Sequence, residues 1–148
     1  MASAELRAHR EAIVREHMES ENVHDFDTTI GTFGHPRYEL VATGDVYDGE
    51  EAVRAYFAES RRAFPDQRNE LVSLHHADDA VIVEFDLLGT HLGPLRALPP
   101  TGRAFRCRMS AHSSSRASGS SASASTSTSS RSCASSGSRT SRPRWPAA

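Results

Sequence analysis

The sequence loses its large aliphatic residues abruptly after residue 112. Residues 113–132 read SSSRASGSSASASTSTSSRS, and the segment 113–148 contains no Val, Ile, Leu, Phe or Tyr. A segment of this composition buries too little apolar surface to offset the entropy that a chain loses on folding, so we expect 113–148 to be a disordered low-complexity tail. The hydrophobic core must therefore come from residues 1–112, which are enough for one domain.

Charge divides between the same two segments. Residues 1–112 hold 12 arginines against all 19 acidic residues, a net charge of −7, while the tail holds five arginines and no acid. An acidic domain is a poor partner for nucleic acid, and the scattered arginines form no binding stripe. No apolar run reaches the length of a membrane span, and Cys107 and Cys133 make neither a disulfide framework nor a metal cluster. We therefore expect a cytoplasmic protein without a metal or a membrane contact.

Helical and strand periodicities follow one another along the domain. Apolar residues recur every three or four positions in 3–22, around 26–33 and in a third segment after the turn TGDVYDG, which predicts three helices. RYELVA, NELVSLHH, AVIVEFDLLGTH and RAFRCRMSA then have strand character, and the last alternates Phe105, Cys107 and Met109 with arginines. This order predicts an α+β domain in which three N-terminal helices pack on a curved antiparallel sheet. Because the tail is expected to be disordered, we expect the last strands to be missing.

The connection between the two longest expected strands reads GTHLGPLRALPPTGR, residues 89–103. This connection and the order of elements resemble the SnoaL-like polyketide cyclase family of the nuclear-transport-factor-2-like superfamily, over roughly residues 8–112. The resemblance implies a cone-shaped α+β barrel, often dimeric, with an apolar pocket between sheet and helices. It also implies chemistry without a cofactor, in which an acid/base carboxylate closes a ring by aldol chemistry.

His91 is the candidate catalytic residue. The resemblance puts a histidine at this strand end, and an imidazole that titrates near neutrality can exchange a proton with an enol or carbonyl oxygen. The alternative is that His91 only ties the following loop down by hydrogen bonding.

Four further residues are candidates for ligand binding. His35 and Tyr38 flank the start of a strand and could line the pocket, while Asp45 and Tyr47, in GDVYDG, could polarise a carbonyl. Structural roles are the alternative for all four, with Asp45 in a turn and Tyr47 in packing. His17 belongs to no pattern of metal ligands.

The sequence departs from the family at the residue that should move the proton. In the family the acid/base Asp or Glu lies on the final strand, but here no acidic residue follows Asp86. We therefore expect a domain that binds a small apolar, oxygenated molecule, descends from a cofactor-free cyclase or isomerase, and is inactive as written. The alternatives are a non-catalytic binding or dimerisation module of the same fold, with a homodimer if the sheet is complete, and a tail that acts as a basic arm.

We interpret the tail as the product of a frameshift. The chain has 17 arginines and no lysine, which is typical of a GC-rich genome. Serine codons read one base early encode Phe, Leu, Ile or Val, while those of alanine and threonine become mostly polar residues or glycine. Under this shift SASASTST, residues 121–128, becomes the alternation of a half-buried strand. A genuine Ser/Ala/Thr linker is the alternative.

Overall fold

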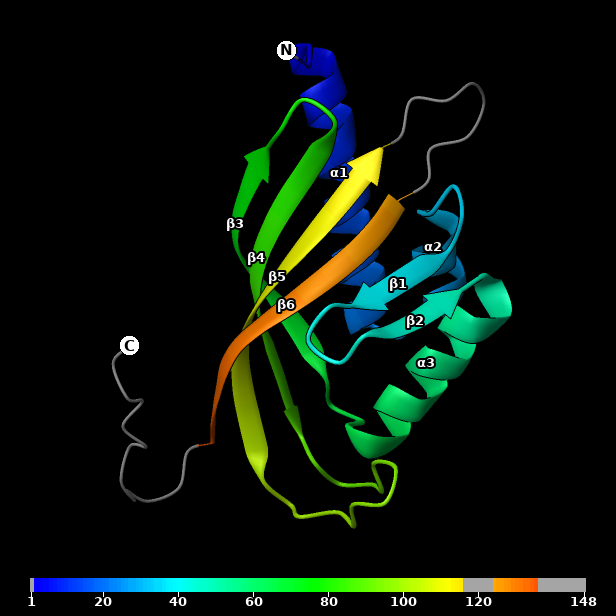
Figure 1. The fold of residues 1–148 in the computed structure, drawn as a ribbon, viewed down its shortest axis with the longest axis vertical. Helices are drawn as coiled ribbons and strands as arrows, with labels where there is room; N and C mark the ends of the chain where they lie inside the picture. Colours follow the sequence, from blue (N-terminus) through cyan, green and yellow to red (C-terminus); the bar gives the residue numbers. More distant parts are fainter. Residues whose placement is uncertain (1, 116–123, 136–148) are drawn as a thin grey trace, which may run out of the picture.

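Three helices pack against one six-stranded sheet in the computed structural model, which describes residues 2–115 and 124–135 (Figure 1). The elements are α1 (Ala4–Asn22), α2 (Phe26–Gly31), β1 (Arg37–Leu40), β2 (Asp45–Asp48), α3 (Glu50–Ala63), β3 (Arg68–His76), β4 (Ala80–Thr90), β5 (Ala104–Ser115) and β6 (Ala124–Ser135). The strand order is β2-β1-β6-β5-β4-β3, antiparallel throughout except for the parallel pair β1–β6. The predicted α+β class is confirmed.

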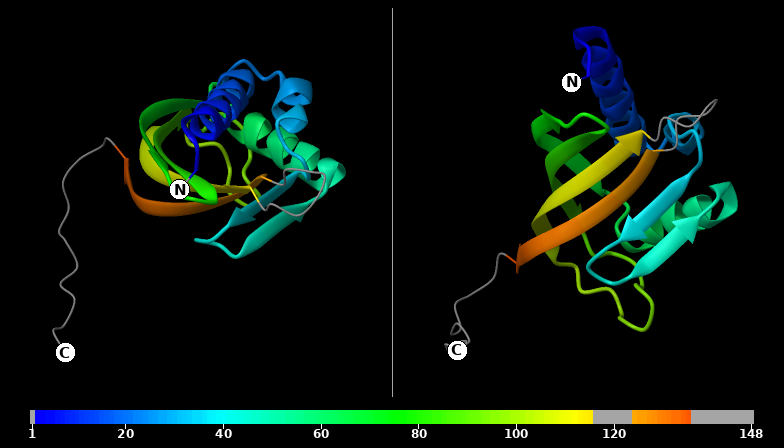
Figure 2. Two further views of the ribbon diagram at one scale, coloured as in Figure 1. Left: turned by 90° about the horizontal axis from the view of Figure 1, so that it is seen from above. Right: turned by 45° about the horizontal axis from the view of Figure 1, so that its top comes forward.

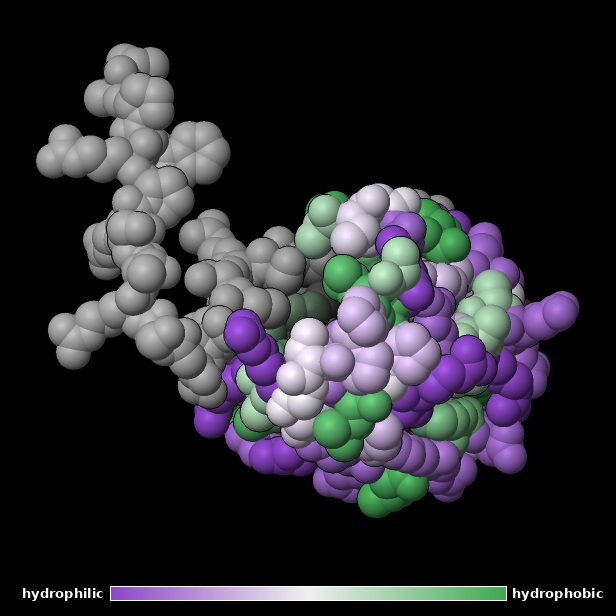
Figure 3. All heavy atoms as spheres, turned by 90° about the horizontal axis from the view of Figure 1, so that it is seen from below, coloured by the Kyte–Doolittle hydropathy of each residue, from purple (hydrophilic) through white to green (hydrophobic). Residues whose placement is uncertain are grey.

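The helices gather on the concave side of the curved sheet (Figure 2). α1 packs against β3, and α3 packs against β1 and β2. Each of the first two helices begins at a side-chain cap: Ser3 accepts a hydrogen bond from the Leu6 amide, and Asp25 accepts one from the Thr28 amide, both at 3.2 Å. The helices and the sheet thus face each other across the interior of the fold, and on the face seen from below hydrophilic residues surround scattered hydrophobic ones (Figure 3).

A cluster of buried side chains joins α2, α3 and β1. Its members are Ile30, Phe33, Tyr38, Val53 and Phe57. Val53 and Phe57 lie four positions apart on α3 and are almost completely buried, as the helical stripe predicts. This cluster fixes the position of Tyr38 beside the interior of the fold.

The last strands differ from the expectation that they are missing or disordered. The structure places residues 113–115 in β5 and residues 124–135 in a further strand, β6, between β5 and β1. The physical reason is that strand pairing uses backbone groups, which serine and threonine possess like any other residue, and β6 satisfies two neighbouring edges at once. Residues 116–123 and 136–148 of the expected tail lie outside the described residues, and the frameshift stays a prediction.

The connection between β4 and β5 is held against the end of α3. The amides of Leu92 and Gly93 both donate to the Ala63 carbonyl at 3.0 Å. The backbone approaches so closely that a Cβ at Gly93 would overlap the Arg62 carbonyl oxygen. This contact anchors the segment that follows His91.

Candidate functional site

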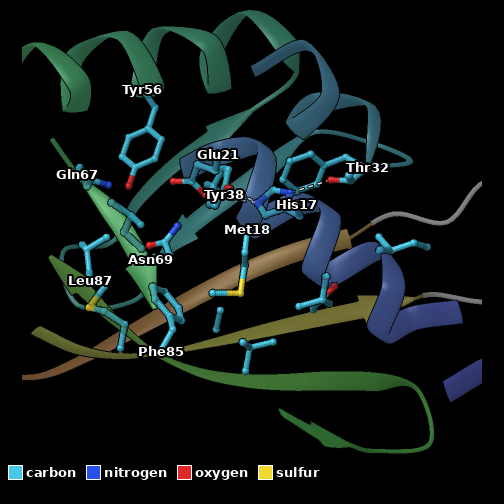
Figure 4. Close-up of a pocket in the computed structure, with 18 residues that line it drawn as sticks. His17, Met18, Glu21, Thr32, Tyr38, Tyr56, Gln67, Asn69, Phe85 and Leu87 are labelled. Atoms are coloured by element: carbon cyan, nitrogen blue, oxygen red, sulfur yellow. Dashed lines mark hydrogen bonds and ion pairs between the residues drawn. The ribbon is translucent and has the colours of Figure 1, made fainter. Parts of the chain in front are cut away.

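A cavity of about 100 Å³ lies between α1 and the concave face of the sheet (Figure 4). This volume is several times the roughly 15 Å³ that one water molecule requires. Its apolar lining consists of Ile13, Val14, Met18, Phe33, Leu40, Val83, Phe85, Leu87, Met109 and Ala111. Its polar lining consists of His17, Glu21, Thr32, Tyr38, Tyr56, Gln67, Asn69 and Ser113. The apolar pocket that the resemblance implied is therefore present.

Strand alternation supplies the floor of this pocket. Val83, Phe85 and Leu87 on β4 share one face, and β5 places Met109 opposite Phe85 and Ala111 opposite Val83. The residues between them point to the other face.

On that opposite, convex face, Asp86 accepts hydrogen bonds from Arg106 and Arg108 at distances down to 2.5 Å. These hydrogen bonds hold the pKa of Asp86 below its usual range, and those from Arg108 have the larger effect. The last carboxylate in the sequence is thus engaged away from the pocket.

His17 forms the centre of a buried hydrogen-bond network in the pocket wall. Its Nδ1 lies 2.7 Å from the Thr32 hydroxyl, which itself donates to the Thr29 carbonyl at 2.6 Å. Because that hydroxyl has its only proton engaged, it accepts from His17, so Nδ1 carries the proton. In the neutral ring, Nε2 must then accept the hydrogen bond that the Tyr38 hydroxyl makes at 2.7 Å.

Burial keeps both members of this hydrogen bond uncharged. Desolvation lowers the pKa of His17 below its ordinary value of 6.5, although the Glu21 carboxylate acts in the opposite direction. Desolvation, reinforced by Glu21, raises the pKa of Tyr38 well above its ordinary value, and that of Tyr56 is raised for the same reasons. Both phenols are therefore proton donors at neutral pH.

Glu21 is the carboxylate of the pocket. It forms a 3.0 Å ion pair with Arg61 on α3, and these residues are only 9% and 8% exposed. Its other oxygen lies 3.7 Å from His17 Nε2. Glu21 thus supplies a compensated negative charge next to the imidazole, one turn away on the same helix.

Of the five residues singled out in the sequence, Tyr38 lines the pocket. His35 is exposed and lies 2.5 Å from Asp48, while Asp45 is bound at 2.8 Å by both Thr43 and Arg96. Tyr47 packs on the Tyr56 ring at a centroid distance of 4.7 Å, outside the pocket lining. The ligand-binding roles of His35, Tyr38, Asp45 and Tyr47 stay predictions, and of these four Tyr38 alone lines the pocket.

His91 lies at the other end of β4, outside the pocket lining. It is 9% exposed, its Nδ1 is 3.1 Å from the Thr101 hydroxyl, and its ring packs on Phe64 at 5.3 Å. Its backbone also pairs with Gly102 and Arg103 across the loop. This geometry is what the loop-tying alternative requires, and the catalytic role stays a prediction.

The remaining polar lining residues escaped sequence reasoning. His17 and Glu21 stand at an i, i+4 spacing directly beside the apolar stripe of α1, which is a signal that the pair lies at the edge of the buried face. Gln67 and Asn69 alternate at the start of a strand with charged residues. Neither pattern by itself distinguishes a pocket from ordinary packing.

Neither a cluster of metal ligands nor a membrane-spanning helix occurs in the described part of the chain. Residues 2–115 and 124–135 contain no group of three or more His, Cys, Asp or Glu side chains placed to hold a metal ion. Across those same ranges, no helix has both the length and the apolar character needed to cross a membrane.

Comparison with known proteins identifies relatives of the fold. A family model described as a SnoaL-like domain matches residues 14–116. IdmH from Streptomyces antibioticus, assigned as a polyketide cyclase, superposes with a TM-score of 0.65 at 22% identity over 82% of this chain and 91% of that one. AclR from Streptomyces galilaeus, assigned as a hydroxylase, superposes with a TM-score of 0.67 at 18% identity, over 84% of this chain and 76% of that one.

A third structure, SalBIII, is described as an epoxide hydrolase/cyclase-like enzyme in pyran ring formation of the polyether salinomycin. It superposes with a TM-score of 0.67 at 21% identity, over 84% of this chain and 92% of that one. At these identities the superpositions show a shared fold. A comparison with curated proteins finds no match.

Proposed function

This chain belongs to the SnoaL-like domain family, and we propose that its pocket binds a small apolar molecule whose oxygen atom meets the hydroxyl of Tyr38. The observation that carries the proposal is the buried Tyr38–His17 hydrogen bond at the wall of a cavity whose lining is mostly apolar. A cavity with one well-placed polar group binds apolar ligands and orients them by their oxygen.

The state of His17 determines which kind of oxygen Tyr38 can bind. While His17 is neutral, the Tyr38 proton points to Nε2, and the phenol oxygen accepts a hydrogen bond from a hydroxyl or an enol. When His17 is protonated, Nε2 donates to Tyr38, whose own proton turns to a carbonyl or enolate oxygen. The same pair therefore accommodates both the keto and the enol form of one molecule.

A test at pH 7 compares the binding of 4-phenylbutan-2-ol, an apolar alcohol whose hydroxyl can donate to the Tyr38 oxygen, to the wild-type protein and to Tyr38→Phe by saturation-transfer NMR. We expect the variant to bind about five- to tenfold more weakly, the range for one lost hydrogen bond. Tyr47→Phe makes the same chemical change outside the pocket lining and serves as the control with unchanged affinity. Absence of binding to the wild type at millimolar concentration, or equal affinity of wild type and Tyr38→Phe, contradicts the proposal.

Acid–base turnover is a second candidate function, favoured by the position of Glu21 3.7 Å from His17 Nε2. An enol would give its proton to Tyr38 as Tyr38 gives its own to His17, leaving an enolate and an imidazolium that the Glu21 carboxylate stabilises. This relay needs no acid on a late strand, where the sequence has none. In the reverse direction, protonated His17 and Tyr38 give the proton to the carbonyl oxygen of a ketone while a water molecule accepts the α-carbon proton, which yields the enol. The relay therefore predicts that the protein accelerates deuterium exchange at the α-carbons of benzylacetone, and that His17→Gln removes this acceleration. If wild type and His17→Gln leave the exchange rate at its uncatalysed value, the domain only binds.

A further inference from the structure

We infer that the pocket has a second polar contact point, formed by Gln67, Asn69 and Tyr56, which selects neutral ligands that carry a second oxygen function. The inference rests on the proposed function, since it names the class of molecule that the same cavity takes. The three side chains come from the start of β3 and from α3, and all line the cavity.

Gln67 and Asn69 are buried amides in the wall of the cavity. They are 6% and 9% exposed, and within the described ranges neither side-chain amide makes a hydrogen bond. Being two positions apart in an extended segment, they point to the same face, and Figure 4 shows both directed into the cavity. Buried amides are normally paired, so these groups can be satisfied only by molecules that occupy the cavity.

Tyr56 adds a donor to the same end of the pocket. Figure 4 shows its hydroxyl pointing toward the Gln67 amide, on the side of the cavity away from Thr32. No hydrogen bond of this hydroxyl occurs among the residues that the structure describes. Together the three groups offer donors and acceptors without carrying a charge.

Asn22 shows what a structural amide looks like in this fold. Its side chain donates to the backbone carbonyl of Asn69 at 2.9 Å and accepts from the backbone N–H of Asn69 at 2.6 Å, joining the end of α1 to β3. The Asn22 side chain thus meets the backbone of Asn69, which leaves the Asn69 side chain free to face the cavity. The Asn22 side chain therefore holds two elements of the fold together, whereas the Asn69 side chain does not.

The charges around the cavity exclude an anionic ligand. Glu21 is the one acidic or arginine side chain among the described lining residues, and the nearby guanidinium of Arg61 is already engaged by it. A carboxylate or phosphate would enter a mostly apolar cavity whose described wall offers no free cation and holds a carboxylate. A carbonyl, hydroxyl or amide oxygen has no such cost and matches the Gln67 and Asn69 amides.

The ligand therefore contacts Tyr38 with one oxygen and the amide pair with another, across an apolar body that packs on Phe85 and Met109. A neutral diketone, hydroxyketone or enolisable dicarbonyl compound fits this description. The second contact point fixes the orientation of such a molecule in the cavity, which a single hydrogen bond cannot do.

One experiment needs no ligand. Asn69→Leu and Gln67→Met replace each amide by an apolar side chain of similar shape, and Asn22→Leu is the matched control. If the cavity amides serve a ligand, their removal leaves the melting temperature unchanged or raises it, whereas Asn22→Leu lowers it by several degrees. If Asn69→Leu and Gln67→Met lowered the melting temperature as much as Asn22→Leu does, the two cavity amides would be structural, and the inference would be overturned.

A second experiment at pH 7 compares three probes with the same phenyl body by saturation-transfer NMR: 4-hydroxy-4-phenylbutan-2-one with a hydroxyl and a carbonyl, 4-phenylbutan-2-ol with a hydroxyl alone, and phenylbutyrate with a carboxylate. We expect the hydroxyketone to bind about fivefold or more tightly than the alcohol, and phenylbutyrate to bind weakest. Gln67→Met and Asn69→Leu should remove the advantage of the hydroxyketone and leave the affinity for the alcohol unchanged.

The outcomes separate the two proposals. Equal binding of the hydroxyketone and the alcohol, or binding of phenylbutyrate as tight as that of the hydroxyketone, overturns the second contact point and leaves the proposed function standing. Failure of both the hydroxyketone and the alcohol to bind overturns the proposed function itself, and with it the inference.

Discussion

The hydroxyl of Tyr38 and Nε2 of His17 lie 2.7 Å apart and join β1 to α1 at the wall of the cavity. The ring of Phe33 packs edge-on against both side chains, at centroid distances of 4.9 and 5.5 Å. This packing helps to bury the hydrogen bond, and the desolvation disfavours the charged forms of both groups by lowering the pKa of His17 and raising that of Tyr38.

Acid should destabilise the protein through His17. The folded state holds the pKa of His17 below its unfolded value of 6.5, so between these two values the unfolded chain binds more protons. Stability is complete above about pH 6.5 and is lost as the pH falls through the lowered pKa. We expect the melting temperature of the wild type to fall between about pH 7.5 and pH 5 more steeply than that of His17→Gln. Parallel profiles of the two proteins would show that His17 is not the group responsible.

That comparison isolates His17 because the surrounding groups remain in both proteins. Glu21 faces the imidazole from the same helix, Tyr38 from β1 and Thr32 from the segment after α2. Their contributions cancel when the two profiles are subtracted.

Removal of Arg61 should be among the most damaging single changes. Arg61→Met leaves the Glu21 carboxylate buried without its partner, at a cost of about 3–5 kcal/mol in the free energy of unfolding. The double variant Glu21→Gln/Arg61→Met should regain part of this loss, because no uncompensated charge remains. Urea unfolding of both measures the difference. Arg15→Met, which breaks an exposed pair with Glu11, is the control and should cost less than about 1 kcal/mol. A double variant less stable than Arg61→Met would refute the explanation.

A methyl group at position 93 should detach the β4–β5 connection from α3. Gly93→Ala forces the Arg62 carbonyl and the new Cβ apart, at a cost of about 2–3 kcal/mol. Gly31→Ala, whose Cβ would meet nothing within 4 Å, is the matched control and should be neutral or slightly stabilising. Thermal unfolding of the two variants tests this, and equal melting temperatures would disprove the close approach.

The pairing of β6 predicts a change in hydrogen exchange. Deletion of residues 116–148 removes the neighbour of β5 on one edge, so the β5 amides that bond to β6 should lose protection. Amides of β3 and β4 that bond to each other are the internal control. Unchanged exchange throughout β5 would instead support the disordered tail expected from composition.

The frameshift hypothesis predicts a specific property of the coding DNA. Insertion of one base before codon 113 should open a reading frame in which serines become apolar residues and the alternation of 121–128 becomes that of a strand. Sequencing the gene decides the matter, and a shifted frame without strand-like sequence would leave the linker as the explanation.

The sequence by itself determined the class of the fold and most of the pocket floor. Helical and strand periods depend on residues two to four positions apart, so the stripe with Val53 and Phe57 and the alternation around Cys107 could be read directly. The GTHLGPLRALPPTGR connection also led to the correct family. Composition gave no sign of β6, which the structure places at residues 124–135, because backbone pairing does not require apolar side chains.

Only the tertiary structure decided the site. His17 meets Tyr38 across 21 residues, Glu21 meets Arg61 across 40, and the cavity gathers them with amides from β3. Such contacts depend on how α1 and α3 cross the sheet, which no local spacing specifies. For the same reason His91 stood out in the sequence, although its side chain lies at the far end of β4, against Phe64 and the loop that it precedes.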